Sequence, residues 1–201
     1  MYGSDEKTKL KGAVKLLLGA MFVGTAILGY APLPHEFLAE FTFISNMTGG
    51  LLLLTDGILN LAGKGLPKIL HLNVSAGLLL VFFICMATLA TPTPFNFGGA
   101  FFFLHVINPL VMAFSYIFLC RDSADSTFKH LLAVPVFSLL YLVFDYILGN
   151  IRGHFVYGFF MPESLPIWMA VLIGAIVYLI MMALGLLLFT LNKKVHKNSA
   201  E

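Results

Sequence analysis

The lysines and arginines of this chain fall in alternate gaps between long apolar stretches. Of the 12 basic residues, only Arg152 lies in the other set of gaps. Because cytoplasmic loops of membrane proteins are enriched in Lys and Arg, this alternation predicts an all-α polytopic integral membrane protein with six transmembrane helices and cytoplasmic N- and C-termini. The eleven residues that set this orientation are Lys7, Lys9, Lys11, Lys15, Lys64, Lys68, Arg121, Lys129, Lys193, Lys194 and Lys197.

The composition leaves room for little besides the membrane bundle. The chain is 59% hydrophobic and 11% charged, whereas a soluble domain is about 25% charged. Six spans of roughly 20 residues use about 120 residues of the chain. We therefore expect a single six-helix transmembrane domain over residues 1–201, with spans at about 12–30, 41–62, 70–90, 100–120, 130–149 and 167–191.

The net charge of +2 reflects this topology. The cations are divided among membrane-flanking segments, so we expect no nucleic-acid partner; the basic tail at 192–197 suits anionic lipid headgroups instead. Membrane lipids or a lipid-like substrate are the expected partners, and the pattern sets no oligomeric state. The host membrane is the plasma membrane in a bacterium, and a plasma or internal membrane in a eukaryote.

Cysteines and metal-binding patterns predict neither a disulfide nor a cofactor. Cys85 and Cys120 fall near opposite faces of the bilayer, while a disulfide needs Cα atoms within about 7 Å, so both are expected as free thiols. No His or Cys spacing matches a zinc site, and no glycine-rich phosphate loop occurs. The lysines and apolar run at the N-terminus mimic a signal peptide without its small-residue cleavage site, so a retained first span is favoured.

Polar side chains from three predicted spans fall at one depth, in the external half of the membrane. Buried polar groups are costly in lipid and are therefore functional candidates. The connection above them, at about 150–166, is aromatic-rich and is either an aromatic belt or lid, or an ordinary loop. The candidates are Thr42, Asn46, His105, Asn108, Tyr141 and Asp145, with Arg152 and His154 in the connection.

These residue types suit nucleophilic chemistry. A threonine hydroxyl reacts only when a base takes its proton, and His105 has a suitable pKa of about 6.5 when unperturbed. Asp145 could orient the imidazole, and Asn46 or Asn108 could donate to an oxyanion. The alternative is that these groups only join helices, through hydrogen bonds of about 0.6–2 kcal/mol each.

Two further features concern the shape of the helices, and a third is a second group of polar residues. Pro109 cannot donate to the carbonyl of His105, four residues earlier, so a kink is expected there. Gly49 and Gly50 thin the second span where another backbone or a ligand could approach. In the inner half, Asp56, Asn60, His71 and Asn73 form a second cluster, which is either a proton or ion path or, preferably, a helix-pairing network.

Three short motifs resemble one membrane family. They are Glu-Phe-Thr-Phe-Ile-Ser-Asn at 40–46, His105 with Pro109, and Tyr-Gly-Phe-Phe at 157–160. The family is that of the androgen-induced and androgen-dependent TFPI-regulating proteins, and the Ser45-Asn46 pair is similar to its prokaryotic branch. Its animal members are threonine hydrolases that cleave fatty acid esters of hydroxy fatty acids.

The resemblance implies that Thr42 is the nucleophile and His105 the general base of an intramembrane lipid-ester hydrolase. Two other hypotheses remain open. The same polar cluster could serve a transporter or binding protein for small molecules or lipids, or it could belong to a structural subunit whose polar residues pair helices.

Overall fold

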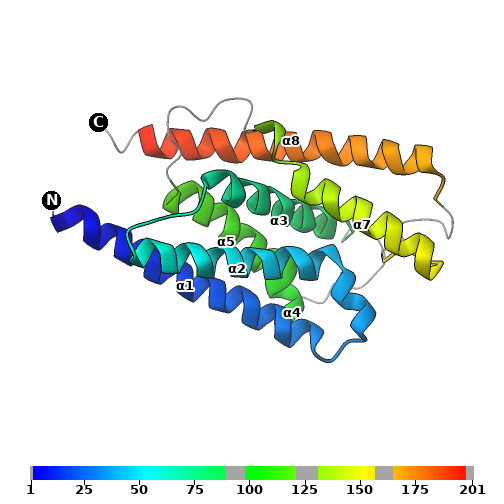
Figure 1. Cartoon of the computed structure of the whole chain (residues 1–201), viewed down its shortest axis with the longest axis horizontal. Helices are drawn as coiled ribbons and strands as arrows, with labels where there is room; N and C mark the ends of the chain where they lie inside the picture. The colour runs from blue at the N-terminus through cyan, green and yellow to red at the C-terminus, as the bar shows by residue number, and fades with distance from the viewer. Residues whose placement is uncertain (1, 89–97, 121–130, 157–164, 198–201) are drawn as a thin grey trace.

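A computed structural model describes residues 2–88, 98–120, 131–156 and 165–197, and all regular elements in these ranges are helical (Figure 1). The longer helices lie roughly along one direction, and both ends of the chain lie at the same end of the bundle (Figure 1). The elements are α1 (Tyr2–Tyr30), η1 (His35–Ala39), α2 (Phe41–Leu61), α3 (Lys68–Thr88), α4 (Gly99–Phe102), η2 (Phe103–Ile107), α5 (Asn108–Phe114), η3 (Ser115–Leu119), α7 (Val136–Arg152) and α8 (Ile167–Lys197).

Five segments of the described chain are long and apolar enough to cross a membrane, so the protein has the features of a multi-pass membrane protein. They cover Glu6–Tyr30, Phe41–Leu61, Lys68–Ala87, Gly99–Leu119 and Ile167–Lys197. The first predicted span, 12–30, lies within α1, which is helical from Tyr2. The fifth predicted span, 130–149, corresponds to α7, which has 17 residues against the about 20 that a perpendicular crossing needs.

α7 nevertheless has the surface of a lipid-facing helix. Its buried residues recur every three or four positions and include the polar Ser138, Tyr141 and Asp145. Apart from Asn150 in the last turn, the opposite face exposes apolar side chains, which is the arrangement expected where the surrounding medium is hydrocarbon. That face consists of Leu140, Val143, Phe144, Ile147 and Ile151.

α3 lies at the centre of the bundle, in contact with α2, α5, α7 and α8. It is the most deeply buried of the five candidate spans. The largest apolar core forms around it, and residues from α2, η3, α7 and α8 contribute to it. Its members include Phe41, Leu72, Ala76, Tyr116, Val134, Tyr141, Met181 and Leu188.

Glycines bring α1 and α2 into close contact. A Cβ atom at Gly19 would lie 2.8 Å from the carbonyl oxygen of Gly50, and one at Gly12 would lie 2.9 Å from that of Gly57. These pairs recur every seven residues on two antiparallel helices, so they form a seam. Small residues allow such backbone approach in membrane bundles. The approach of another backbone that the sequence predicts at Gly50 is therefore confirmed.

The predicted interruption near His105 takes the form of wider helical turns. The helix from Gly99 to Leu119 is continuous, but residues Phe103–Ile107 (η2) adopt π-helical turns and α5 begins directly afterwards. Pro109 lacks an N–H and its ring would clash with the carbonyl four residues earlier. A π turn relieves this clash and often marks functional sites in helices.

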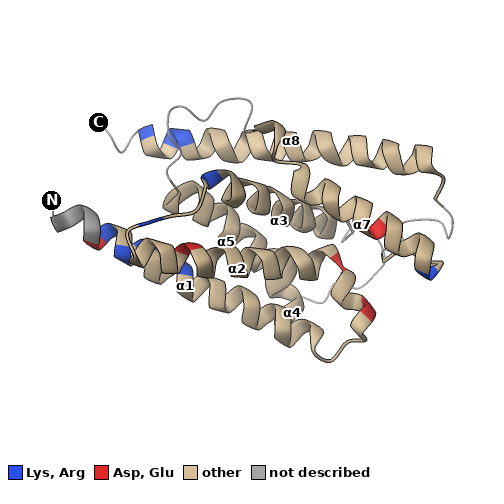
Figure 2. Ribbon diagram, in the orientation of Figure 1, with Lys and Arg blue, Asp and Glu red and all other residues tan. Residues whose placement is uncertain are grey.

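The described lysines gather at one end of the bundle. Figure 2 shows them on the N-terminal part of α1, on the connection before α3, at the start of α3 and at the end of α8, all at the end where both chain termini lie. Arg152, the last residue of α7, is at the other end of that helix. Arg121 and Lys129 lie outside the described residues. The predicted segregation of charge thus holds for the described cations.

Candidate active site and a buried charge cluster

The hydroxyl of Thr42 and the ring of His105, which the sequence places at one depth, lie close together in the structure. Thr42 is the second residue of α2 and is 4% exposed. Its Oγ1 lies 3.5 Å from Nε2 of His105, at the outer limit of a hydrogen bond. Catalytic hydrogen bonds are often long until substrate is bound, so this spacing suits a nucleophile and its base.

A backbone carbonyl determines the tautomer of His105. Nδ1 lies 2.9 Å from the carbonyl oxygen of Phe101. A carbonyl only accepts, so Nδ1 carries the proton and, in the neutral ring, Nε2 has the lone pair that faces Thr42. The imidazole also stacks on the Phe101 ring, with centroids 4.0 Å apart. The carbonyl and the aromatic ring together hold the imidazole in an orientation that can accept the threonine proton.

Asp145 does not have the orienting role that the sequence suggested. Its Oδ1 accepts from the backbone N–H of Val156 at 3.2 Å, so it caps the turn after α7. The nitrogen of His105 that it was expected to hold is bonded to Phe101 instead. Asp145 also lines a small cavity of about 20 Å³, between α7 and α8, which neither Thr42 nor His105 lines.

Asn46 and Asn108 form a network between helices beside the threonine. The Asn46 amide donates to the carbonyls of Thr42 at 2.8 Å and Leu104 at 3.1 Å. The Asn108 amide donates to the Asn46 side-chain oxygen at 2.8 Å and to the Thr25 hydroxyl at 3.0 Å. An amide has two donor hydrogens, so both are fully used. The expected oxyanion donors are therefore already engaged in the structure.

The remaining predicted residues are Tyr141 in α7, and Arg152 and His154 at its end. The Tyr141 hydroxyl donates to the carbonyl of Ala39, just before α2, at 3.1 Å. Arg152 and His154 are exposed at the end of α7. Tyr157 and its neighbours in the family-like motif at 157–160 lie outside the described residues.

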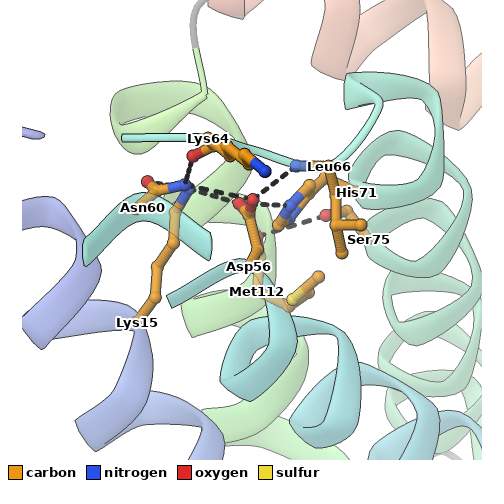
Figure 3. Close-up of polar contacts among 8 residues, drawn as sticks. All are labelled: Lys15, Asp56, Asn60, Lys64, Leu66, His71, Ser75 and Met112. Atoms are coloured by element: carbon orange, nitrogen blue, oxygen red, sulfur yellow. Dashed lines mark hydrogen bonds and ion pairs between the residues drawn. The ribbon is translucent and has the colours of Figure 1, made fainter. Parts of the chain in front are cut away.

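The second polar cluster centres on a fully buried carboxylate (Figure 3). Oδ2 of Asp56 lies 2.6 Å from Nζ of Lys15 and 2.8 Å from Nε2 of His71. Oδ1 accepts from the backbone N–H of Leu66 at 2.7 Å and from the Asn60 amide at 3.2 Å. Four donors from α1, α2, α3 and the connection between α2 and α3 therefore converge on one carboxylate.

Lys15 is the member of this cluster that the sequence reading missed. The alternation of charge predicts a place on the cytoplasmic flank, but the Lys15 side chain is 0% exposed and also donates to the Asn60 side-chain oxygen at 3.3 Å. The signal was present: Lys15 follows Gly12-Ala13-Val14 inside the apolar run. A buried lysine needs an anion, and Asp56 lies at a comparable depth in the next span. Asn73, in contrast, has a buried side-chain oxygen with no hydrogen bond in the described chain.

Cys85 and Cys120 are both buried, and the structure records no disulfide between these two residues. No group of His, Cys, Asp or Glu within the described residues has the geometry of a metal site.

Comparison of the chain with protein-family models, with curated proteins and with solved structures finds no match. The functional interpretation therefore depends on the geometry of the two polar sites.

Proposed function

We propose that the protein is an intramembrane hydrolase of lipid esters, with Thr42 as nucleophile and His105 as general base. The observation that supports this proposal is the 3.5 Å approach of the Thr42 hydroxyl to the unprotonated Nε2 of His105. The two residues come from different helices and are 63 positions apart. The family-like motif at 40–46 and the histidine–proline pair are the features of the sequence that agree with it.

The reaction follows from the tautomer. His105 Nε2 takes the proton of the Thr42 hydroxyl as its oxygen attacks the ester carbonyl. The imidazolium then returns this proton to the departing alkoxide, which leaves an acyl-threonine and a free alcohol. Water, deprotonated by the same nitrogen, attacks the acyl-threonine and releases the fatty acid. The Phe101 carbonyl stabilises the imidazolium throughout, because it accepts from the other ring nitrogen.

A lipid substrate agrees with the surroundings of the pair. Phe101 and Phe103 expose 40% and 36% of their surface, and His105 is partly exposed beside them. In a membrane this face meets acyl chains. An ester could therefore approach laterally from the bilayer, with its chains against the phenylalanines.

We also propose the six-span topology with both termini in the cytoplasm, in which α7 is the fifth span and adds one crossing to the five long apolar segments. The apolar outer face of α7, the position of both chain ends at one end of the bundle, and the gathering of lysines there support it. Under this topology the Thr42–His105 pair lies towards the external leaflet.

A fluorophosphonate probe tests the nucleophile. We expect an adduct on Thr42 of the purified protein and hydrolysis of a fatty acid ester of a hydroxy fatty acid. Thr42→Val, which keeps the shape, should abolish both, and His105→Gln should lower both at least tenfold. Ser45→Ala is the matched control on the same helix and should leave them unchanged. Full turnover by Thr42→Val would reject the proposal.

The alternative is a protein that binds or transports a lipid or small molecule at the same place. The full engagement of the Asn46 and Asn108 donors favours it, since no amide is free to stabilise an oxyanion. Retention or flux of the same ester in proteoliposomes, without hydrolysis, would decide for this alternative.

A further inference from the structure

Thr42 lies in the first turn of α2, which has few hydrogen bonds of its own. The first N–H groups of a helix have no partner within it, and helix ends fray. Glu40, the residue before α2, makes no side-chain capping hydrogen bond among the described residues. Phe101 fixes His105 through its carbonyl and its ring. The geometry of the Thr42–His105 pair therefore depends on the contacts that hold the start of α2.

A tyrosine from α7 holds the segment that leads into Thr42. The Tyr141 hydroxyl donates to the carbonyl of Ala39 at 3.1 Å. The Tyr141 ring packs against that of Phe41, with centroids 4.8 Å apart, and the Phe137 ring lies 5.5 Å from the same phenylalanine. Tyr141 is buried, so these contacts are shielded from solvent. One residue of α7 thus contacts the backbone and a side chain directly before the threonine.

A second tyrosine, from α1, holds the same turn. The Tyr30 hydroxyl donates to the Glu40 carboxylate at 2.6 Å. The Tyr30 ring packs against that of Phe43, with centroids 4.9 Å apart. Each tyrosine therefore combines a hydrogen bond to a residue before Thr42 with a ring contact to one of its two chain neighbours. The two tyrosines come from different helices, so the turn is held against both.

We propose that Tyr30 and Tyr141 are positioning residues, which hold the start of α2 so that the Thr42 hydroxyl faces Nε2 of His105. We call them the tyrosine clamp. The clamp acts through the chain that leads into Thr42, because its hydroxyls bind the Ala39 carbonyl and a carboxylate at the next residue. Its effect on turnover rests on the proposed function.

The Thr42–His105 pair tolerates little displacement. Oγ1 lies 3.5 Å from Nε2, at the outer limit of a hydrogen bond. A misplacement of about 1 Å in an active site can lower the rate about 100-fold. A substitution of tyrosine by phenylalanine removes the hydrogen bond and keeps the ring contact. It should therefore affect turnover more than it affects folding.

Steady-state hydrolysis by the full-length protein in detergent tests the clamp, with a fatty acid ester of a hydroxy fatty acid as substrate. We expect Tyr141→Phe and Tyr30→Phe each to lower kcat at least about fivefold and to leave KM within about twofold, because they disturb the reacting pair and not the lipid-facing surface. Tyr146→Phe is the matched control in α7 and should change neither constant, since this hydroxyl makes no hydrogen bond within the described residues. An unchanged kcat in either clamp variant, or a change confined to KM, would overturn the proposal.

A thiol in place of the Thr42 hydroxyl reports the same geometry without turnover. In a variant whose two native cysteines are replaced by serine, Thr42→Cys places a thiol opposite Nε2 of His105. This base should accelerate alkylation by iodoacetamide at pH 7, because the thiolate is the reactive form, and His105→Gln should slow it. Tyr141→Phe should slow it at least about threefold, and Tyr146→Phe should not. Equal rates with and without Tyr141→Phe would overturn the proposal.

The two experiments separate failure of the clamp from failure of the proposed function. Full turnover by Thr42→Val rejects the hydrolase, and the alkylation rates then decide alone whether the clamp positions residue 42. A fluorophosphonate adduct on Thr42 together with an unchanged kcat in Tyr141→Phe overturns the clamp and leaves the hydrolase intact.

Discussion

Nζ of Lys15 lies 2.6 Å from Oδ2 of Asp56, and both side chains are fully buried between α1 and α2. The glycine seam makes this contact possible, because Gly12 and Gly57 allow the two backbones to approach. Each charge of a buried ion pair is stabilised by the other, because loss of one partner leaves an uncompensated charge. The pair therefore ties the first two helices together at the lysine-rich end.

Removal of one partner of this pair should destabilise the bundle strongly. We expect Asp56→Asn or Lys15→Met to cost about 3–5 kcal/mol, the range for an unpaired buried charge. The double variant should regain much of this loss, because it buries no charge. Lys64→Met, at an exposed lysine, is the control. Thermal unfolding in detergent measures the effect, and equal midpoints for Lys15→Met and Lys64→Met would contradict the role of the pair.

Alanine substitutions at two glycines of α1, one inside the glycine seam and one outside it, should differ in their effect on stability. Gly19→Ala places a Cβ 2.8 Å from the backbone of α2, so overpacking should cost about 1–3 kcal/mol. A Cβ at Gly24, also in α1, meets no atom within 4 Å. Gly24→Ala should therefore be neutral or stabilise by up to about 1 kcal/mol. The unfolding midpoint of Gly19→Ala should therefore be lower than that of Gly24→Ala. A higher midpoint for Gly19→Ala would mean that α1 and α2 do not pack through Gly19.

The asparagine network should show energetic coupling. Asn46 and Asn108 are joined at 2.8 Å between α2 and α5, and such bonds in membrane bundles contribute about 0.6–1.7 kcal/mol. A double-mutant cycle with Asn46→Ala and Asn108→Ala should give a coupling energy in this range. The same cycle with Asn150→Ala in place of Asn108→Ala should give none, since Asn150 is exposed and bonds within its own helix.

Glu40, the residue that precedes α2, should make the stability of the protein depend on pH. Burial raises the pKa of its carboxyl above 4.5, and the Tyr30 hydroxyl, which donates to it at 2.6 Å, offsets part of this rise. The folded protein then binds a proton at Glu40 more tightly than the unfolded chain. Stability from this group therefore increases as the pH falls through the raised pKa towards 4.5.

Glu40→Gln removes this dependence. The variant should be most stable relative to the wild type at neutral pH, and the difference in unfolding midpoint should shrink as the pH approaches 4.5. Tyr30→Phe removes the hydroxyl that stabilises the charged Glu40 carboxylate. In this variant the stability should therefore change more steeply with pH than in the wild type. A midpoint difference that stays constant between pH 7 and pH 4 would show that the carboxyl has an ordinary pKa.

The proposed topology can be tested by labelling single introduced cysteines in a variant that carries Cys85→Ser and Cys120→Ser. A membrane-impermeant maleimide should label His154→Cys on intact cells, because the end of α7 is expected outside. Lys64→Cys, at an equally exposed position, should react only after permeabilisation. Labelling of both variants on intact cells would contradict the odd number of crossings that the proposed topology places between these positions.

The helices and the depth of their polar groups could be predicted from the sequence. The common depth of Thr42 and His105 follows from two predicted spans that enter from the same side, since each residue adds about 1.5 Å of rise along a helix axis. The interruption of the helix at His105 follows from Pro109, because a proline lacks the backbone N–H that would bond to the carbonyl four residues earlier. Both are consequences of position along the chain.

Which groups face each other at a given depth was decided only by the tertiary structure. Lys15 became a buried partner of Asp56 because the glycine seam brings α1 against α2, and the bonding of His105 to Phe101 excludes the predicted contact with Asp145. Depth is a one-dimensional quantity, and hydropathy and charge encode it along the chain. The rotation of each helix about its axis depends on packing with segments far away in the sequence, and it determines the partner of every buried polar group.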